Sequence, residues 1–114
     1  MSDPKLILVA EVHGLAGRAD ELRELLDALA DGSRGEPGCA SFRVLCADDI
    51  GEFVLISGWM QQDALESHYA TPHYRRYRAA VTPLLARPSD VTVHYVSSTV
   101  RPVDPNPPDP GLLG

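Results

Sequence analysis

The chain has 114 residues, of which 44% are hydrophobic, and its formal net charge of −6 gives a pI near 5.0. This length fits one domain, no apolar run approaches the ~18 residues of a membrane-spanning helix, and an acidic chain without a basic stripe argues against nucleic acid as a partner. The opening residues, Met-Ser-Asp-Pro-Lys, lack the pattern of a secretory signal peptide. We therefore expect a cytoplasmic protein.

The hydrophobic pattern predicts strands and helices in a regular order. Runs of aliphatic and β-branched residues indicate strands, whereas four leucines between Leu22 and Leu29 recur at helical spacing. Gly32 is the expected stop of that helix, and Thr71 and Pro72 are expected to cap and begin the last one. The predicted elements are strands at 5–13, 39–47, 52–60 and 90–99, and helices at 19–31, 62–70 and 72–85.

This β-α-β-β-α-β order, with its second helical element broken in two, is the ferredoxin-like α+β pattern with a four-stranded antiparallel sheet. We expect the domain to cover residues 1–100. The remaining stretch, 101–114, contains five prolines and cannot extend a central strand. It is predicted to be a Pro-rich C-terminal tail, extended or disordered.

Both faces of the predicted sheet are apolar, although the helices can cover only one of them. In the third strand, Phe53, Leu55 and Trp59 alternate with Val54 and Ile56. An exposed apolar patch of this size is rare on a monomer, so we expect a second copy to cover it through a two-fold axis. The last strand repeats the pattern, with Val91, Val93 and Tyr95 on one face and Val96 and Val100 on the other.

The cysteines and the arginine cluster carry no predicted chemistry. Cys39 and Cys46 lie on one strand, about 23 Å apart at the usual rise, which is too far for a disulfide. Neither has the spacing of a metal ligand, so no metal site is predicted. Arg75, Arg76 and Arg78 are expected to form the solvated face of a helix.

The candidate site lies where the third strand meets the helices that follow it. His68 follows Leu65 by three residues and is expected to face the sheet. An apolar cavity with a few convergent polar groups is the usual form of a small-molecule site, although core packing alone would also place aromatic side chains here. The predicted catalytic residue is His68, and the predicted substrate-binding residues are Ser57, Trp59, Tyr69, His73, Tyr74 and Tyr77.

The segment from Ser57 to Tyr74 resembles the signature of the antibiotic biosynthesis monooxygenase family. It has a tryptophan at a strand end, a short polar turn, Ala-Leu, a histidine and then Thr-Pro-His-Tyr. The sequence Glu-Pro-Gly-Cys at 36–39 resembles a second family landmark. The resemblance covers about residues 5–98 and implies a dimeric α+β barrel. Ser57 replaces a family glutamate, and Leu55 replaces an asparagine of some members that oxidise aromatic compounds.

The resemblance implies a monooxygenase that needs neither metal nor flavin and uses dioxygen to oxidise an aromatic, phenolic or quinol-like compound, such as a polyketide anthrone. His68 would be the base, because imidazole titrates near neutral pH. One alternative is a dimer of the same fold that binds small molecules without catalysis. Another is a haem-binding or haem-degrading protein with His68 or His73 on the iron, although the first strand lacks the asparagine of that branch.

Overall fold

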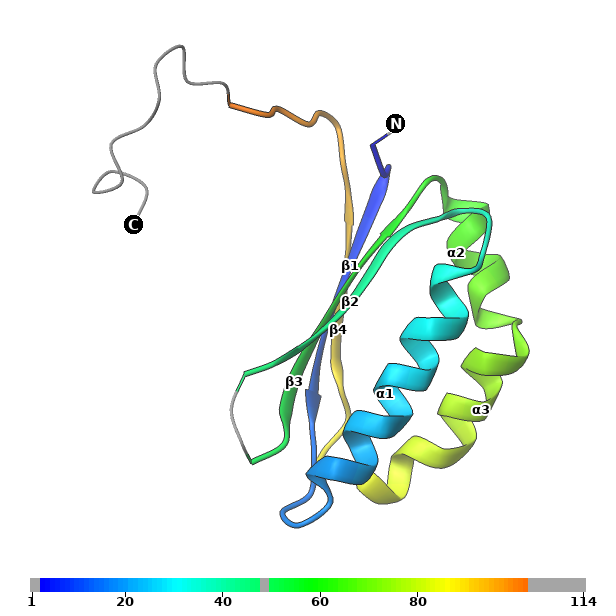
Figure 1. The fold of residues 1–114 in the computed structure, drawn as a ribbon. Helices are drawn as coiled ribbons and strands as arrows, with labels where there is room; N and C mark the ends of the chain where they lie inside the picture. Colours follow the sequence, from blue (N-terminus) through cyan, green and yellow to red (C-terminus); the bar gives the residue numbers. More distant parts are fainter. Residues whose placement is uncertain (1–2, 48–49, 103–114) are drawn as a thin grey trace.

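A computed structural model describes residues 3–47 and 50–102 of the chain. It confirms the ferredoxin-like α+β fold, with an antiparallel sheet in the order β2-β3-β1-β4 and all helices on one face (Figure 1). The strands are β1 (Leu6–His13), β2 (Cys39–Cys46), β3 (Glu52–Trp59) and β4 (Asp90–Tyr95). The helices are α1 (Ala19–Arg34), α2 (Gln62–Tyr69) and α3 (Pro72–Val81), followed by the 3-10 turn η1 (Thr82–Leu84).

The core lies between the sheet and the helices. On β3, Phe53, Leu55 and Trp59 are buried and face the helices, as the alternation of the sequence predicts. Val12 on β1 pairs with Phe53 and adds to the same layer. Burial of each large apolar side chain contributes roughly 1.5–3 kcal/mol, which fixes the register of the two central strands.

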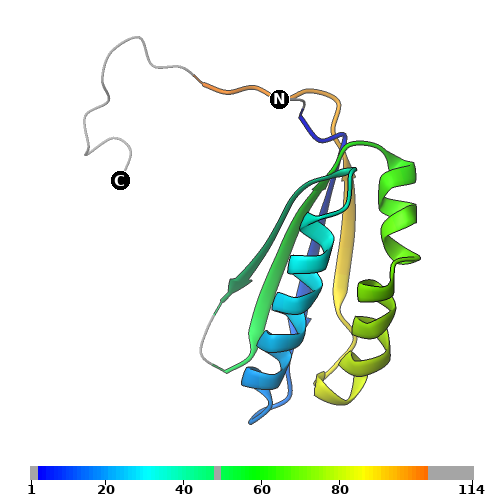
Figure 2. The same ribbon diagram turned by 45° about the vertical axis from the view of Figure 1, so that its right-hand side comes forward.

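Helix α1 continues three residues beyond the predicted end, so the expectation that Gly32 stops it is wrong. Gly32 has an ordinary helical position, and the helix ends at Arg34 with Gly35 as its C-cap. The reason for the glycine is a close contact, because a Cβ on Gly32 would lie 2.6 Å from Cγ of His73. This glycine lets α3 approach α1, and Figure 2 shows the two helices side by side.

The break between α2 and α3 forms as predicted, around Thr71 and Pro72. The Thr71 hydroxyl donates to the carbonyl of His68 at 2.7 Å and accepts from the amide of Tyr74 at 3.3 Å. Helix α3 ends at Val81 rather than at residue 85, and η1 follows it. Pro83 explains the early end, because proline has no amide hydrogen and its ring crowds the preceding turn.

Strand β4 is shorter than predicted and ends at Tyr95. Its partner β1 begins at Leu6, and the last bond of this ladder region runs from the amide of Val96 to the carbonyl of Lys5, at 2.8 Å. The prediction that Val100 belongs to a strand face is therefore wrong, and its side chain is exposed. Of the predicted tail, 103–114 lies outside the described residues.

The face of the sheet opposite the helices carries Ile7, Val9, Val54 and Ile56, which we call the outer apolar face. All four are half-buried, and no described helix covers them (Figure 1). None of the described helices combines the length and apolar character needed to cross a bilayer.

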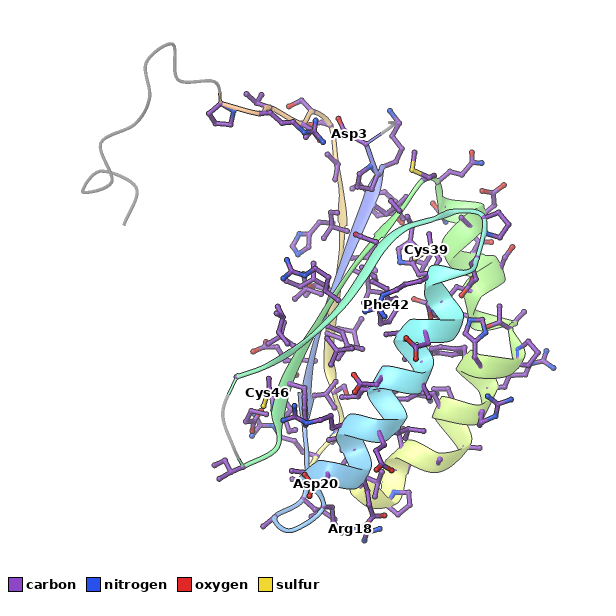
Figure 3. All side chains as sticks on the ribbon, in the orientation of Figure 1. Asp3, Arg18, Asp20, Cys39, Phe42 and Cys46 are labelled. Carbon is purple, nitrogen blue, oxygen red and sulfur yellow. The ribbon has the colours of Figure 1, made fainter. Side chains whose placement is uncertain are left out.

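Cys39 and Cys46 are not joined by a disulfide. They lie at the two ends of β2 (Figure 3), which is why no disulfide joins them.

Candidate functional site

A cavity of about 490 Å³ lies between the sheet and the α2–α3 side of the helical layer. Its volume is in the range of small-molecule sites. Aliphatic side chains from β1 and β3 form much of its wall, and Phe42 reaches it from β2 (Figure 3). The polar lining residues are Ser57, His68, Tyr69, Tyr74, Tyr77, Arg78, Thr82, Arg87 and Ser89.

His68 lies on the cavity wall within an aromatic cluster. It is 3% exposed, and its ring centroid is 4.6 Å from Trp59, 5.0 Å from Tyr74 and 5.6 Å from Tyr69. Helix α2 places it one turn after the buried Leu65, so the sheet-facing position predicted for it is confirmed. The surrounding rings limit the motion of the imidazole.

Glu36 joins the two helical histidines. Its Oε2 atom accepts one hydrogen bond from Nδ1 of His68 and another from Nε2 of His73, both at 2.7 Å. The carboxylate is largely buried, with 11% of its side chain exposed. Three segments therefore converge on one oxygen atom: the connection between α1 and β2, α2, and α3.

This contact fixes the tautomer of His68. A carboxylate oxygen accepts, so Nδ1 carries the proton and the lone pair of the neutral ring lies on Nε2. Burial lowers the pKa of His68 from its usual value near 6.5, although the hydrogen bond that His68 donates to Glu36 opposes this. The ring is therefore neutral at pH 7. Nε2 has no hydrogen-bond partner among the described residues, and it is not sealed from solvent.

Two close contacts hold the Glu36 segment in place. Gly38 packs so tightly on α2 that a Cβ on it would lie 2.2 Å from Cβ of Ala64, and Gly32 admits the ring of His73. Any larger side chain at Gly38 must displace backbone or helix. The two glycines thus position the carboxylate between the helices.

The structure brings most of the predicted site residues to the cavity. Ser57, Tyr69, Tyr74 and Tyr77 line it together with His68. Tyr77 is the most buried of the phenols, and this burial raises its pKa to about 12, so it stays protonated and can donate.

Trp59 and His73 do not line the cavity. Trp59 is fully buried behind His68, and its indole nitrogen donates to the Ser57 hydroxyl at 3.0 Å. His73 contacts Glu36 instead. Both residues thus lie next to the residues of the cavity wall, and a role in binding substrate stays a prediction for each of them.

Sequence reasoning did not select Glu36, Arg78 or Arg87. Glu36 was visible only as part of a motif, since its contact with His68 spans 32 residues. Arg78 was grouped with two neighbours, and Arg87 lay in a connection before a strand.

Glu36, His68 and His73 are also the group whose donor atoms, all within 4.8 Å, could hold a metal ion among the described residues. Carboxylate with two imidazoles suits several transition metals. In the arrangement observed, both ring nitrogens donate to the one oxygen, so a metal would have to displace these protons.

The fold and cavity define a ferredoxin-like α+β domain with a small-molecule pocket under its helices. Residues 5–80 match the family described as antibiotic biosynthesis monooxygenase. The chain belongs to this family, which has the dimeric α+β barrel fold.

Several relatives support the assignment. Rv0793 of Mycobacterium tuberculosis, provisionally named a monooxygenase, is 46% identical over 72 residues, covering 63% of this chain and 71% of that protein. Its structure aligns with 87% of this chain and 95% of its own at 36% identity, with a TM-score of 0.73. The structure of PA3566 from Pseudomonas aeruginosa gives a TM-score of 0.76 at 31% identity, covering 86% of this chain and 98% of that one.

Proposed function

We propose that this protein is a cofactor-independent monooxygenase that oxidises an aromatic phenol or quinol-type compound with dioxygen. One observation carries the proposal. A buried, neutral histidine lies on the wall of an apolar cavity, with its Nδ1 proton held by a carboxylate. This is the arrangement that a general base requires, since its other nitrogen is free to accept a proton.

The reaction balances without a separate reductant, because the substrate supplies the electrons. His68 removes a proton from the phenol or from the acidic carbon of an anthrone, and the resulting anion reduces dioxygen to a peroxide anion. The peroxide takes this proton back from His68 and becomes a hydroperoxide. His68 then removes the second proton, from the carbon that carries the hydroperoxide, the O–O bond breaks, and the departing hydroxide takes this proton from His68. One oxygen atom becomes the new carbonyl, and the other leaves as water.

The other residues that line the cavity are suited to bind the substrate, to stabilise its anion and to exclude water. The phenols of Tyr69, Tyr74 and Tyr77 and the hydroxyl of Ser57 are donors for oxygen atoms of a bound ring. Developing anionic charge is stabilised most by donors that are already oriented. The apolar wall keeps water away from the anion and the hydroperoxide.

The test is oxygen uptake by the wild-type protein with anthrones and dihydroxynaphthalenes, in buffer that contains a chelator and no flavin. We expect uptake that rises in proportion to protein concentration and gives a quinone product. The heat-denatured protein is the control. Binding of these compounds without uptake above the control would contradict catalysis and favour a binding protein.

We further propose that the outer apolar face pairs with that of a second copy. Ile56 and Val9 are register partners at its centre and remain half-buried in one chain. Replacing Ile56 with aspartate would bury a charge at the interface, which is strongly unfavourable. We expect the mass measured by light scattering to fall from that of a dimer to that of a monomer.

Ala79→Asp is the matched control, since Ala79 is exposed on α3. It should leave the mass unchanged. A wild-type protein that is monomeric at micromolar concentration would contradict the pairing.

A further inference from the structure

Arg78 and Arg87 line the cavity and are also exposed to solvent, so they lie at its rim. On α3, Tyr74, Tyr77, Arg78 and Val81 follow helical spacing and all line the cavity. Their neighbours Arg75 and Arg76 point to other faces and do not line it. The helix therefore places Arg78 at the solvent-exposed rim of the cavity and the other two arginines outside it.

No acidic side chain balances these arginines within the cavity wall. Among the described residues, its lining includes no aspartate or glutamate, so Arg78 and Arg87 are the only fully charged groups of this lining at neutral pH. Arg78 also forms no ion pair with any carboxylate of the described residues. In a chain with a net charge of −6, the guanidinium of Arg78 is therefore an unbalanced positive charge at the rim of an apolar site.

Arg87 is held by a neighbouring cluster that is itself close to neutral. Its Nη2 atom lies 3.3 Å from both ring nitrogens of His13, so the guanidinium stacks on the ring. His13 in turn contacts Glu52 at 2.6 Å and Asp90 at 2.9 Å. Two carboxylate acceptors require two N–H donors, so His13 is an imidazolium. Two cations then face two anions, and the cluster as a whole does not repel an anionic ligand.

We propose that the substrate is an aromatic carboxylic acid whose carboxylate binds Arg78 and Arg87 while its phenol or acidic carbon reaches His68. Guanidinium groups bind carboxylates through two parallel hydrogen bonds. Arg78 lies one helical turn, about 6 Å, beyond Tyr74, which contacts the ring of His68. The planar aromatic rings of such a substrate would therefore span the distance between His68 and the two arginines. This inference rests on the proposed function only for the role of His68, since anion binding itself requires no turnover.

The experiment measures binding without oxygen, using 6-hydroxy-2-naphthoate and its methyl ester. The two probes share the phenol and the rings and differ in charge. Quenching of Trp59, the only tryptophan, reports binding because its ring packs against that of His68 on the cavity wall. We expect the wild type to bind the acid at least 10-fold more tightly than the ester, with a preference that weakens as salt is added.

Arg78→Gln is the decisive variant, because the guanidinium has no ion pair to lose within residues 3–47 and 50–102. It should bring the preference for the acid to about threefold or less, and Arg87→Gln should act in the same direction. Arg76→Gln removes a nearby exposed arginine of the same helix and should leave the preference unchanged. Thermal unfolding of each variant verifies that it folds.

Equal binding of acid and ester by the wild type would overturn the inference, and so would an equal effect of Arg76→Gln. Failure of this inference can be distinguished from failure of the proposed function. A preference for the acid without any oxygen uptake would support anion recognition and reject the oxygenase. Oxygen uptake with neutral quinols and no preference for the acid would reject anion recognition alone.

Discussion

Replacing His68 with asparagine is expected to lower enzyme-dependent oxygen uptake by about 10²- to 10⁴-fold, the usual contribution of a general base. The asparagine amide can still donate to Glu36, where Nδ1 of the imidazole donates in the native protein. It offers no nitrogen lone pair to take a proton from the substrate. The loss should therefore appear in kcat, with a folded protein whose cavity still binds the substrate.

Imidazole added to a His68→Ala variant provides a second measurement. The missing ring leaves space in the cavity wall, and free imidazole should restore part of the uptake there but not in the wild type. If the asparagine variant retains wild-type uptake, His68 is not the base.

The pH dependence of the wild type follows from the lowered pKa of His68. Burial favours the neutral ring, so the base loses activity only when the pH falls below about 6.5, its unperturbed value. The acidic limb of kcat/KM should lie below that pH. A limb above it would point to another group.

Replacing Glu36 with glutamine is expected to lower kcat by roughly 10- to 10³-fold and to change KM little. The carboxylate that orients a catalytic histidine contributes up to about 10⁴-fold in serine proteases. Glutamine keeps the size of the side chain but loses the charge that stabilises the imidazolium formed during proton transfer. Its amide can also donate to Nδ1 of His68, which would move the ring proton to Nε2 and block the base.

The same substitution should move the acidic limb further down in pH, because Glu36 raises the pKa of His68 against the effect of burial. Glu66→Gln, on the exposed side of α2, is the matched control and should leave both kcat and the limb unchanged. An unchanged kcat in Glu36→Gln would show that the carboxylate serves the fold alone.

The sequence predicted the fold well because strand alternation, helical spacing and helix caps depend on residues close together in the chain. Alternating burial on β3 and leucine spacing on α1 follow from strand and helix periodicity. Thr71 and Pro72 act through the first turn of their own helix. The predicted ends of α1, at Gly32, and of α3, beyond Pro83, were wrong for different reasons. Gly32 is explained by the ring of a distant histidine, and Pro83 was outweighed by the apolar pattern around it.

The candidate site was predicted only in part for the same reason. His68 could be selected because its own helix places it on the buried stripe. Its link to Glu36 depends on how the connection before β2 meets α2, and no spacing in the sequence encodes that contact. Trp59 illustrates the reverse case. Its strand face was predicted, but its position behind His68, outside the cavity, depends on packing depth.

The connection from α1 to β2 is only four residues long, Gly35 to Gly38, and its ends are fixed by a helix and a strand. One inserted residue adds up to ~3.6 Å of chain, which exceeds the tolerance of a 2.7 Å hydrogen bond. Surface loops usually accept changes of length. Here the length of the segment determines whether Glu36 reaches both His68 and His73. Relatives that share the histidines but differ in this length are therefore expected to have lost the paired contact.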